Sequence, residues 1–145
     1  MKAFTIFGFV VMLSSQALAL QLDGTFTVAS VSDPERYLKE DGSGKITFSE
    51  ESPQGWSFVE AEKDRYKIAN TVTNHYISCG SAEDDICGAS DKAQLFQIHN
   101  DGDNVYSFVD AEDSLPLYAG PGNHLVLGSS DYALPEYLVF KLTKV

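Results

Sequence analysis

The sequence predicts an all-β fold built from three repeats of about forty residues. Aromatic residues that open alternating apolar runs recur at Phe26, Tyr66 and Tyr106, forty residues apart. Each repeat contains four short segments in which apolar and polar residues alternate, which is typical of strands with one buried face. No window shows the stripe of apolar residues that an amphipathic helix needs. Because one repeat cannot bury both faces of its strands, the three repeats must close on one another.

The phase of the repeats places each strand. The apolar anchors, in chain order, are Phe26 and Val28, Tyr37 and Leu38, Ile46, Trp56 and Phe58; Tyr66 and Ile68, Tyr76 and Ile77, Ile86, Phe96 and Ile98; Tyr106 and Phe108, Leu117 and Tyr118, Leu125 and Leu127, Leu138 and Phe140. The expected strands are 24–30, 36–40, 45–49, 56–61, 65–70, 75–79, 85–88, 95–99, 105–110, 116–119, 124–128 and 137–142. In this phase Leu138 is the third-repeat counterpart of Trp56 and Phe96, forty-two residues after Phe96. Segments such as 41–44 and 100–104 between the strands are rich in Gly, Asp and Asn, which tolerate the positive φ of tight turns.

Length and charge limit the class of protein further. A chain of 145 residues is the size of one domain, with a core large enough to fold without many disulfides. Its 10 Lys and Arg against 21 Asp and Glu give a formal net charge of −11. Because nucleic acids bind clustered cations, we expect no nucleic-acid partner. We also expect a monomer with no membrane partner.

The first nineteen residues have the pattern of a secretory signal peptide. Lys2 provides a positive start, residues 3–13 are apolar, and Ala17 and Ala19 form the small-x-small pattern after which signal peptidase cuts. The apolar run is too short for a membrane span, and polar residues follow it directly. We therefore expect a secreted, extracellular protein in which residues 20–145 form a single domain, with a net charge of 9 − 21 = −12 once Lys2 is removed.

Cys79 and Cys87 are the two cysteines of the sequence. In a secreted protein such a pair is typical of a disulfide, and the short separation, with Gly80 and acidic residues between, suits a bridge across a hairpin. Two free thiols or half of a metal site are the alternatives, but no His or Cys stands at zinc-like spacing. We expect a Cys79–Cys87 disulfide and no bound metal.

The sequence lacks the common catalytic motifs. It has no G-x-S-x-G, H-E-x-x-H or C-x-x-C pattern. Two of the residues His75, His99 and His124 flank expected strands, where histidines commonly pack half-exposed. Carboxylate pairs such as that at 50–51 fit an acidic, solvated surface. The sequence therefore predicts a binding protein with no catalytic residues and no cofactor, rather than an enzyme.

The residues at the start of the last strand of each repeat carry a resemblance. They are Gln54-Gly55-Trp56, Gln94-Leu95-Phe96 and Glu136-Tyr137-Leu138. Together with three repeats of four strands, they resemble the β-trefoil superfamily, and the first two resemble the Q-x-W pattern of ricin-B-type lectins. The resemblance implies a pseudo-threefold fold of twelve strands, with six in a barrel and three hairpins capping one end.

The lectin resemblance implies a sugar site that this sequence does not complete. In that family an Asn directly precedes the Gln, whereas Pro53 and Ala93 stand here, and an acidic residue follows the second strand only at Glu40. Because sugars are held by a few directed hydrogen bonds and stacking, losing these partners removes most of the binding. The alternative function is a carbohydrate-binding lectin with a non-canonical site, at Tyr118 or Tyr132.

The fold also resembles small fungal inhibitors of cysteine proteases (the mycocypins and their relatives) and plant Kunitz-type inhibitors. The mycocypin resemblance implies contacts from the connection at 30–35, which contains Pro34, and from that at 49–55, which contains Pro53. Proline fixes φ and stiffens a loop, so that docking costs little entropy. Fungal relatives also use an Asn in the connection between the fifth and sixth strands, against asparagine-specific proteases, and Asn74 stands in that connection here, at 71–74.

These resemblances favour an inhibitor of extracellular, papain-like proteases over a lectin, because the residues of the sugar site are missing. The connection at 60–65, which Kunitz inhibitors use, is short and sets its basic residues among acidic ones, which argues against trypsin as the target. The expected protease-contact residues are Ser32, Asp33, Pro34, Ser52, Pro53, Gln54, Gly55 and Asn74. By the same resemblance, the protein is expected to act in host interaction or defence.

Overall fold

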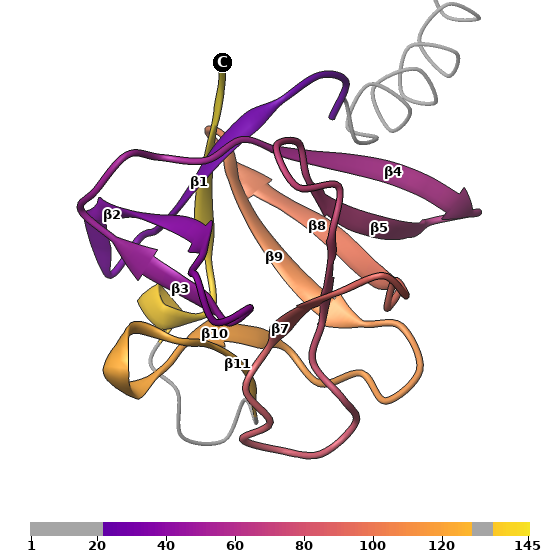
Figure 1. Ribbon diagram of the computed structural model, residues 1–145. Helices are drawn as coiled ribbons and strands as arrows, with labels where there is room; N and C mark the ends of the chain where they lie inside the picture. The colour runs from indigo at the N-terminus through magenta and orange to yellow at the C-terminus, as the bar shows by residue number, and fades with distance from the viewer. Residues whose placement is uncertain (1–21, 129–134) are drawn as a thin grey trace, which may run out of the picture.

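The computed structural model describes residues 22–128 and 135–145, and the expected signal peptide lies outside them. The described residues form twelve strands and two short 3-10 helices (Figure 1). These elements are β1 Phe26–Ser30, β2 Asp33–Glu40, β3 Ile46–Ser49, β4 Trp56–Glu62, β5 Arg65–Asn70, β6 Tyr76–Ser78, β7 Gly88–Ser90, β8 Phe96–Gly102, β9 Val105–Asp110, β10 Leu117–Ala119, η1 Pro121–Asn123, β11 Leu125–Leu127, η2 Pro135–Tyr137 and β12 Phe140–Lys144. Within the described ranges, no helix has both the length and the apolar character needed to cross a membrane.

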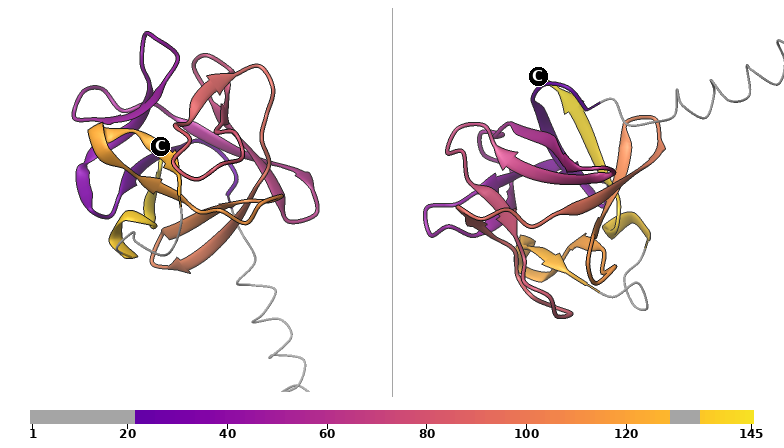
Figure 2. Two further views of the ribbon diagram at one scale, coloured as in Figure 1. Left: turned by 90° about the horizontal axis from the view of Figure 1, so that it is seen from below. Right: turned by 90° about the vertical axis from the view of Figure 1, so that its right-hand side faces the viewer.

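Six strands close into a barrel. Antiparallel pairing runs from β1 through β4, β5, β8, β9 and β12 and returns to β1, so the ring has no unpaired edge. The other strands pair as three hairpins, β2–β3, β6–β7 and β10–β11, which face the viewer when the molecule is seen from below (Figure 2, left). This arrangement is the β-trefoil that the sequence predicts.

The aromatic anchors that lie forty residues apart occupy equivalent places in the barrel. Each anchor pairs with an equivalent residue on the neighbouring strand: Phe26 with Trp56, Tyr66 with Phe96, and Tyr106 with Phe140. All three partners are fully buried, at 0% exposure. The anchors therefore occupy equivalent environments, which confirms the predicted pseudo-threefold arrangement.

The pairing also corrects the predicted phase of the third repeat. Phe140, and not Leu138, is the counterpart of Phe96, so the spacing is 140 − 96 = 44 residues instead of 42. Leu138 consequently occupies the place of the glutamine in the Q-x-W pattern, and the assignment of Glu136 to that place was wrong. The register was ambiguous in the sequence because Leu138, Phe140 and Leu142 alternate equally well in either phase.

Several strand bounds differ from the expected ones. The strand expected at 137–142 begins only at Phe140, because residues from Pro135 form a 3-10 helix instead. The strand expected at 85–88 lies at Gly88–Ser90, since Cys87 and not Ile86 is the buried residue of this segment. The second strand begins three residues early, at Asp33, and the other ends differ by up to three residues.

Apolar side chains from both layers meet on the barrel axis. The barrel contributes Val28, Ile68 and Phe108, and the hairpins contribute Leu38, Ile77 and Leu117, all of them buried. The Phe108 ring centroid lies 5.8 Å from that of Phe58 and 5.2 Å from that of Phe140. Burying each such side chain contributes about 1.5–3 kcal/mol to the free energy of unfolding.

The expected disulfide is present. Cys79 Sγ and Cys87 Sγ are bonded, and both residues are buried. Cys79 follows β6 and Cys87 precedes β7, directly beyond the paired residues Ser78 and Gly88. The bond therefore closes the acidic loop of the β6–β7 hairpin, as predicted.

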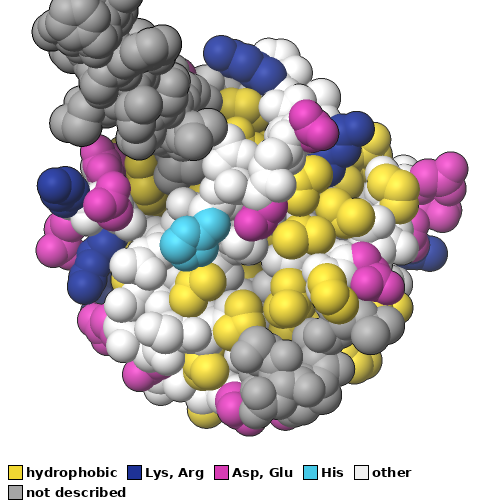
Figure 3. Space-filling view, turned by 180° about the vertical axis from the view of Figure 1, so that it is seen from behind, with side chains coloured by type: hydrophobic (Ala, Val, Ile, Leu, Met, Phe, Trp, Pro, Cys, Tyr) yellow, Lys and Arg dark blue, Asp and Glu magenta, His cyan; other side chains and the backbone are white. Residues whose placement is uncertain are grey.

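The surface is acidic, as the net charge of −11 requires. On the rear face, acidic side chains lie around a group of hydrophobic ones (Figure 3).

Candidate functional site

Three buried polar side chains occupy equivalent positions at the ends of barrel strands. Ser30, Asn70 and Asp110 are the last residues of β1, β5 and β9, forty residues apart, with exposures of only 2%, 0% and 2%. Among the residues that the structure describes, they are the only buried polar or charged ones. Because buried polar groups need hydrogen-bond partners, each marks a network that fixes the chain where it leaves the barrel.

In the first network, Asn70 joins the segment before β4 to the turn after β5. Its Nδ2 donates to Gln54 Oε1 at 2.7 Å. Its Oδ1 accepts from the backbone N–H groups of Val72 at 2.8 Å and Thr73 at 3.2 Å. Gln54 Oε1 also accepts from the backbone N–H of Glu40 at 2.8 Å. The amide of Gln54, an expected protease contact, is therefore engaged inside the protein.

The second repeat has the same network with a carboxylate in place of the amide. Gln94 Nε2 donates to Asp110 Oδ1 at 3.0 Å and to the carbonyl oxygen of Gly80 at 2.9 Å. Gln94 Oε1 accepts from the backbone N–H of Cys79. Asp110 Oδ2 accepts from the backbone N–H of Asp113 at 2.8 Å. A glutamine and a buried polar residue thus act as a pair in both repeats.

The third network is smaller because Leu138 stands where the other repeats have glutamine. The Ser30 and Ser32 hydroxyls lie 2.6 Å apart, and Ser30 Oγ accepts from the backbone N–H of Ser32 at 3.2 Å. These bonds fix only the tight turn between β1 and β2.

Grooves lie beside two of the three networks. One groove, of about 460 Å³, runs between the second and third repeats; its lining includes Glu62, Arg65, Lys92, Gln94, Glu112 and Asp113. The other, of about 220 Å³, lies between the third and first repeats; its lining includes Ser32, Asp33, Arg36, Asn123 and Tyr137. Both mix acidic, basic and neutral polar groups.

Between the first and second repeats, at the position equivalent to these grooves, the side chain of Glu40 joins the two repeats. Its Oε1 accepts from Thr73 Oγ1 at 2.8 Å, and its Oε2 lies 2.8 Å from His75 Nδ1. This hydrogen bond, followed by the negative charge of the same carboxylate, raises the pKa of His75 above its ordinary value of 6.5. The end of β2 is thereby joined to the β5–β6 turn.

The two expected proline-bearing connections lie side by side. Between β1 and β2 the connection is only the turn of Val31 and Ser32, so Pro34 belongs to β2 and not to a loop as expected. Arg36 on β2 links this corner to the β3–β4 loop. Its Nε lies 2.9 Å from Asp33 Oδ2, and its Nη2 lies 3.9 Å from Glu50 Oε1.

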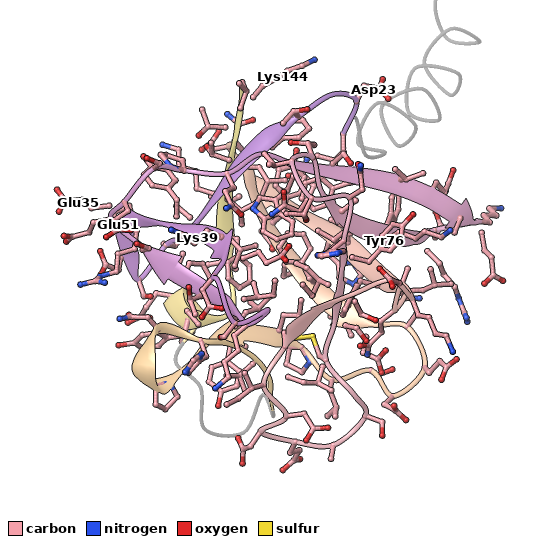
Figure 4. The ribbon with its side chains drawn as sticks, viewed as in Figure 1. Asp23, Glu35, Lys39, Glu51, Tyr76 and Lys144 are labelled. Carbon is pink, nitrogen blue, oxygen red and sulfur yellow. A yellow bond between two sulfur atoms is a disulfide. The ribbon has the colours of Figure 1, made fainter. Side chains whose placement is uncertain are left out.

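A second ion pair supports the same corner. Lys39 Nζ lies 3.6 Å from Glu51 Oε2, and Figure 4 shows Lys39, Glu51 and Glu35 on the side of the β2–β3 hairpin. The two pairs hold the β3–β4 loop against β2, although each is too exposed to stabilise the fold by much on its own.

The β5–β6 turn adjoins the same surface. The backbone N–H and Oγ1 of Thr71 both donate to the carbonyl oxygen of Gly55, at 3.0 Å and 3.1 Å. The three expected connections are therefore contiguous. We call residues 31–34, 50–55 and 71–75 together the contact surface.

The expected contact residues divide into two groups on this surface. The exposed ones are Asp33, Pro34, Ser52, Pro53 and Asn74. Ser32, Gln54 and Gly55 are half-buried. A Cβ atom at Gly55 would overlap the side chain of Thr25, so this position needs glycine for packing.

Of the two aromatic residues expected for a non-canonical sugar site, only Tyr118 lies among the described residues, and it is not free to stack on a sugar. Tyr118 is buried, its hydroxyl donates to Asp84 Oδ1 at 3.3 Å, and burial raises its pKa above 10.0. Tyr132 lies outside the described residues.

Two features of the site were missed in the sequence. The first is the row of Ser30, Asn70 and Asp110, which the forty-residue spacing could have revealed. The second is the bridge from Glu40 to His75, which has no sequence signal because the two residues belong to different repeats.

The geometry and the comparisons agree on the class of protein, a β-trefoil. No family model and no curated protein matches the sequence. The structure is similar to the designed 3-fold symmetric protein ThreeFoil, with a TM-score of 0.73 and 14% identity over 85% of this chain and 100% of that one.

Two natural β-trefoils are similar over most of the chain. The Macrolepiota procera ricin B-like lectin in complex with lactose has a TM-score of 0.73 and 13% identity, covering 87% of this chain and 100% of the lectin. A proteinase inhibitor from Coprinopsis cinerea has a TM-score of 0.66 and 15% identity, covering 84% of this chain and 97% of the inhibitor. One is a lactose-bound lectin and the other a proteinase inhibitor, and at these identities the likeness shows the fold alone.

Proposed function

We propose that this protein is a secreted, non-enzymatic inhibitor of papain-like cysteine proteases that acts through the contact surface. The observation that carries the proposal is that the β3–β4 loop contacts both other connections: Arg36 on β2 lies near Glu50, and Thr71 of the β5–β6 turn donates to the Gly55 carbonyl oxygen. The similarity to a fungal proteinase inhibitor supports it.

The contact surface has the rigidity that inhibition by a docked loop requires. Ser49 Oγ accepts from the backbone N–H of Glu51 at 3.1 Å at the start of the β3–β4 loop, and Gln54 is fixed at its end. Between them Ser52 and Pro53 are exposed. A loop that is ordered before docking loses little entropy in an enzyme cleft, so more of the contact energy appears as affinity.

Loosening this loop is expected to weaken inhibition of papain. In the double variant Ser52→Gly/Pro53→Gly the loop gains conformational freedom in the unbound protein, and we expect the inhibition constant to rise about tenfold. The measurement is papain turnover of a fluorogenic peptide at increasing concentrations of residues 20–145. Pro34→Ala should have a smaller effect, since Pro34 lies in β2 next to Asp33, which pairs with Ser30 of β1.

The matched control places the same kind of change outside the contact surface. The double variant Asp101→Gly/Asp103→Gly on the β8–β9 hairpin should inhibit papain as the unaltered protein does. Lack of inhibition by the unaltered protein, or equal weakening in both double variants, would contradict the proposal.

Glycan binding is a second candidate function, favoured by the 460 Å³ groove. Its lining mixes the carboxylates of Glu62, Glu112 and Asp113 with the cations of Arg65 and Lys92. Hydroxyl groups both donate and accept hydrogen bonds, so a neutral saccharide can satisfy both kinds of group, whereas a charged ligand would be repelled by one of them. The similarity to a lactose-bound lectin supports this candidate.

A variant that fills the groove tests this second function. Ser81 lines the groove and is exposed, so Ser81→Trp should abolish binding of lactose, chitotriose or cellotriose measured by titration calorimetry. Gly42→Trp is the matched control, because a side chain at Gly42 enters open space. If none of these saccharides binds the unaltered protein, or if Ser81→Trp binds equally well, the candidate is excluded.

A further inference from the structure

The side chain of Glu40 reaches from the first repeat to the β5–β6 turn of the second. Although it carries a negative charge, the side chain is only 9% exposed. Its two oxygens contact Thr73 Oγ1 and His75 Nδ1, each at 2.8 Å. These two partners are the residues on either side of Asn74, so one carboxylate holds both flanks of the residue that the turn exposes.

The turn needs such support because Asn74 has a left-handed backbone, with φ of 65°. This conformation is unfavourable for residues other than glycine, although Asn tolerates it better than most. The Asn70 side chain holds the first half of the turn, through the N–H groups of Val72 and Thr73. The His75 side chain is tied to the neighbouring repeat through Glu40.

We propose that Glu40 is a positioning residue for the contact surface: it holds the β5–β6 turn so that Asn74 is presented to the protease, and its hold weakens when His75 loses its proton. This inference rests on the proposed inhibitor function, whose contact surface includes the turn.

The pH dependence follows from the groups around the His75 ring. Two carboxylates face it: Glu40 from β2, and Asp91 from the segment after β7, whose Oδ1 lies 3.9 Å from His75 Nε2. The hydrogen bond to Glu40 is the main reason why the pKa of His75 lies above 6.5. Below pH 6.5 the imidazolium–carboxylate pair is fully formed, and it is lost as the pH rises through the raised pKa. Because the His75 side chain is 41% exposed, solvent weakens the pair and the effect on inhibition should be about threefold to fivefold.

The experiment compares inhibition constants for papain at pH 5.5 and pH 8.5. Each variant is expressed as a ratio to the unaltered protein at the same pH, which cancels the pH dependence of papain itself. For Glu40→Gln and His75→Gln we expect a ratio of about three to five at pH 5.5 and below about two at pH 8.5. Asp91→Asn, the matched control, should give a ratio near one at both pH values, because Asp91 is 96% exposed.

Two further measurements make the outcome decisive. Asn74→Ala should weaken inhibition at both pH values; an unchanged constant would show that the turn makes no contact and would overturn the proposal. A Glu40→Gln ratio that is the same at both pH values would also overturn it.

The positioning role can be tested without a protease. The ¹⁵N order parameter of the Asn74 amide should fall in Glu40→Gln at pH 5.5, and an unchanged value would overturn the role. If the unaltered protein fails to inhibit papain while the order parameter falls as expected, the proposed function is wrong and the structural role of Glu40 stands.

Discussion

Replacement of Trp56 by alanine should lower the free energy of unfolding by about 3–5 kcal/mol, the range for removal of a fully buried large aromatic side chain. Trp56 is 0% exposed, and its Nε1 donates to the carbonyl oxygen of Leu38 at 3.0 Å. The side chain therefore joins the barrel strand β4 to the hairpin strand β2. Its loss leaves a cavity where the layers meet and removes the partner of the Leu38 carbonyl.

The pseudo-threefold arrangement supplies the control for this prediction. Phe96 and Phe140 occupy the equivalent places, so a phenylalanine ring fits this environment. Trp56→Phe should therefore cost only about 1–2 kcal/mol, from one lost hydrogen bond and a small loss of volume. Urea unfolding followed by circular dichroism measures both variants. If both variants lower the free energy of unfolding equally, a phenylalanine does not fit the place of Trp56, and the three positions are not equivalent in energy.

Replacement of Asn70 by alanine should lower the free energy of unfolding by about 2–4 kcal/mol, because it removes a fully buried side chain that makes three hydrogen bonds. The N–H groups of Val72 and Thr73 lose their acceptor, and Gln54 Oε1 loses a donor. We expect this variant to lose inhibitory activity as well, since the networks around Gln54 hold two parts of the contact surface.

Ser30→Ala is the matched comparison for Asn70→Ala. Ser30 has the equivalent position and the same degree of burial, but its hydroxyl serves only Ser32. The cost should be about 1 kcal/mol, that of a single local hydrogen-bonding group. Both variants are measured in the same urea titration. If Ser30→Ala lowers the free energy of unfolding as much as Asn70→Ala, burial alone and not the number of hydrogen bonds determines the loss of stability.

The fold could be predicted from the sequence because its repeats share one set of buried anchors. Phe26, Tyr66 and Tyr106 occupy equivalent positions, as their forty-residue spacing predicted. The alternation of apolar and polar residues predicted most strand ends to within a few residues. The third repeat was misplaced since Leu138 and Phe140 are equally apolar, and only pairing with Tyr106 selects between them. Local alternation carries no information on which of two registers a strand adopts.

The candidate site was predictable only in part. A proline in a connection predicts a rigid, exposed loop, and Ser52 and Pro53 are indeed exposed, although their contact with a protease stays a prediction. Gln54 was assigned to the same loop, but its amide turns inward to Asn70, a contact across sixteen residues that no local pattern specifies. The bridge between Glu40 and His75 depends on how the repeats pack and likewise could not be inferred.

The pairing of β1 with β12 joins Phe26 to Lys144, close to the two ends of the described chain. This seam cannot form until residues as far as Lys144 are available to pair, so the barrel closes only after all twelve strands are present. Contacts so distant along the chain also make folding slow. Deleting the last five residues should therefore leave a chain that never reaches its native state, whereas an insertion at a hairpin tip should be tolerated.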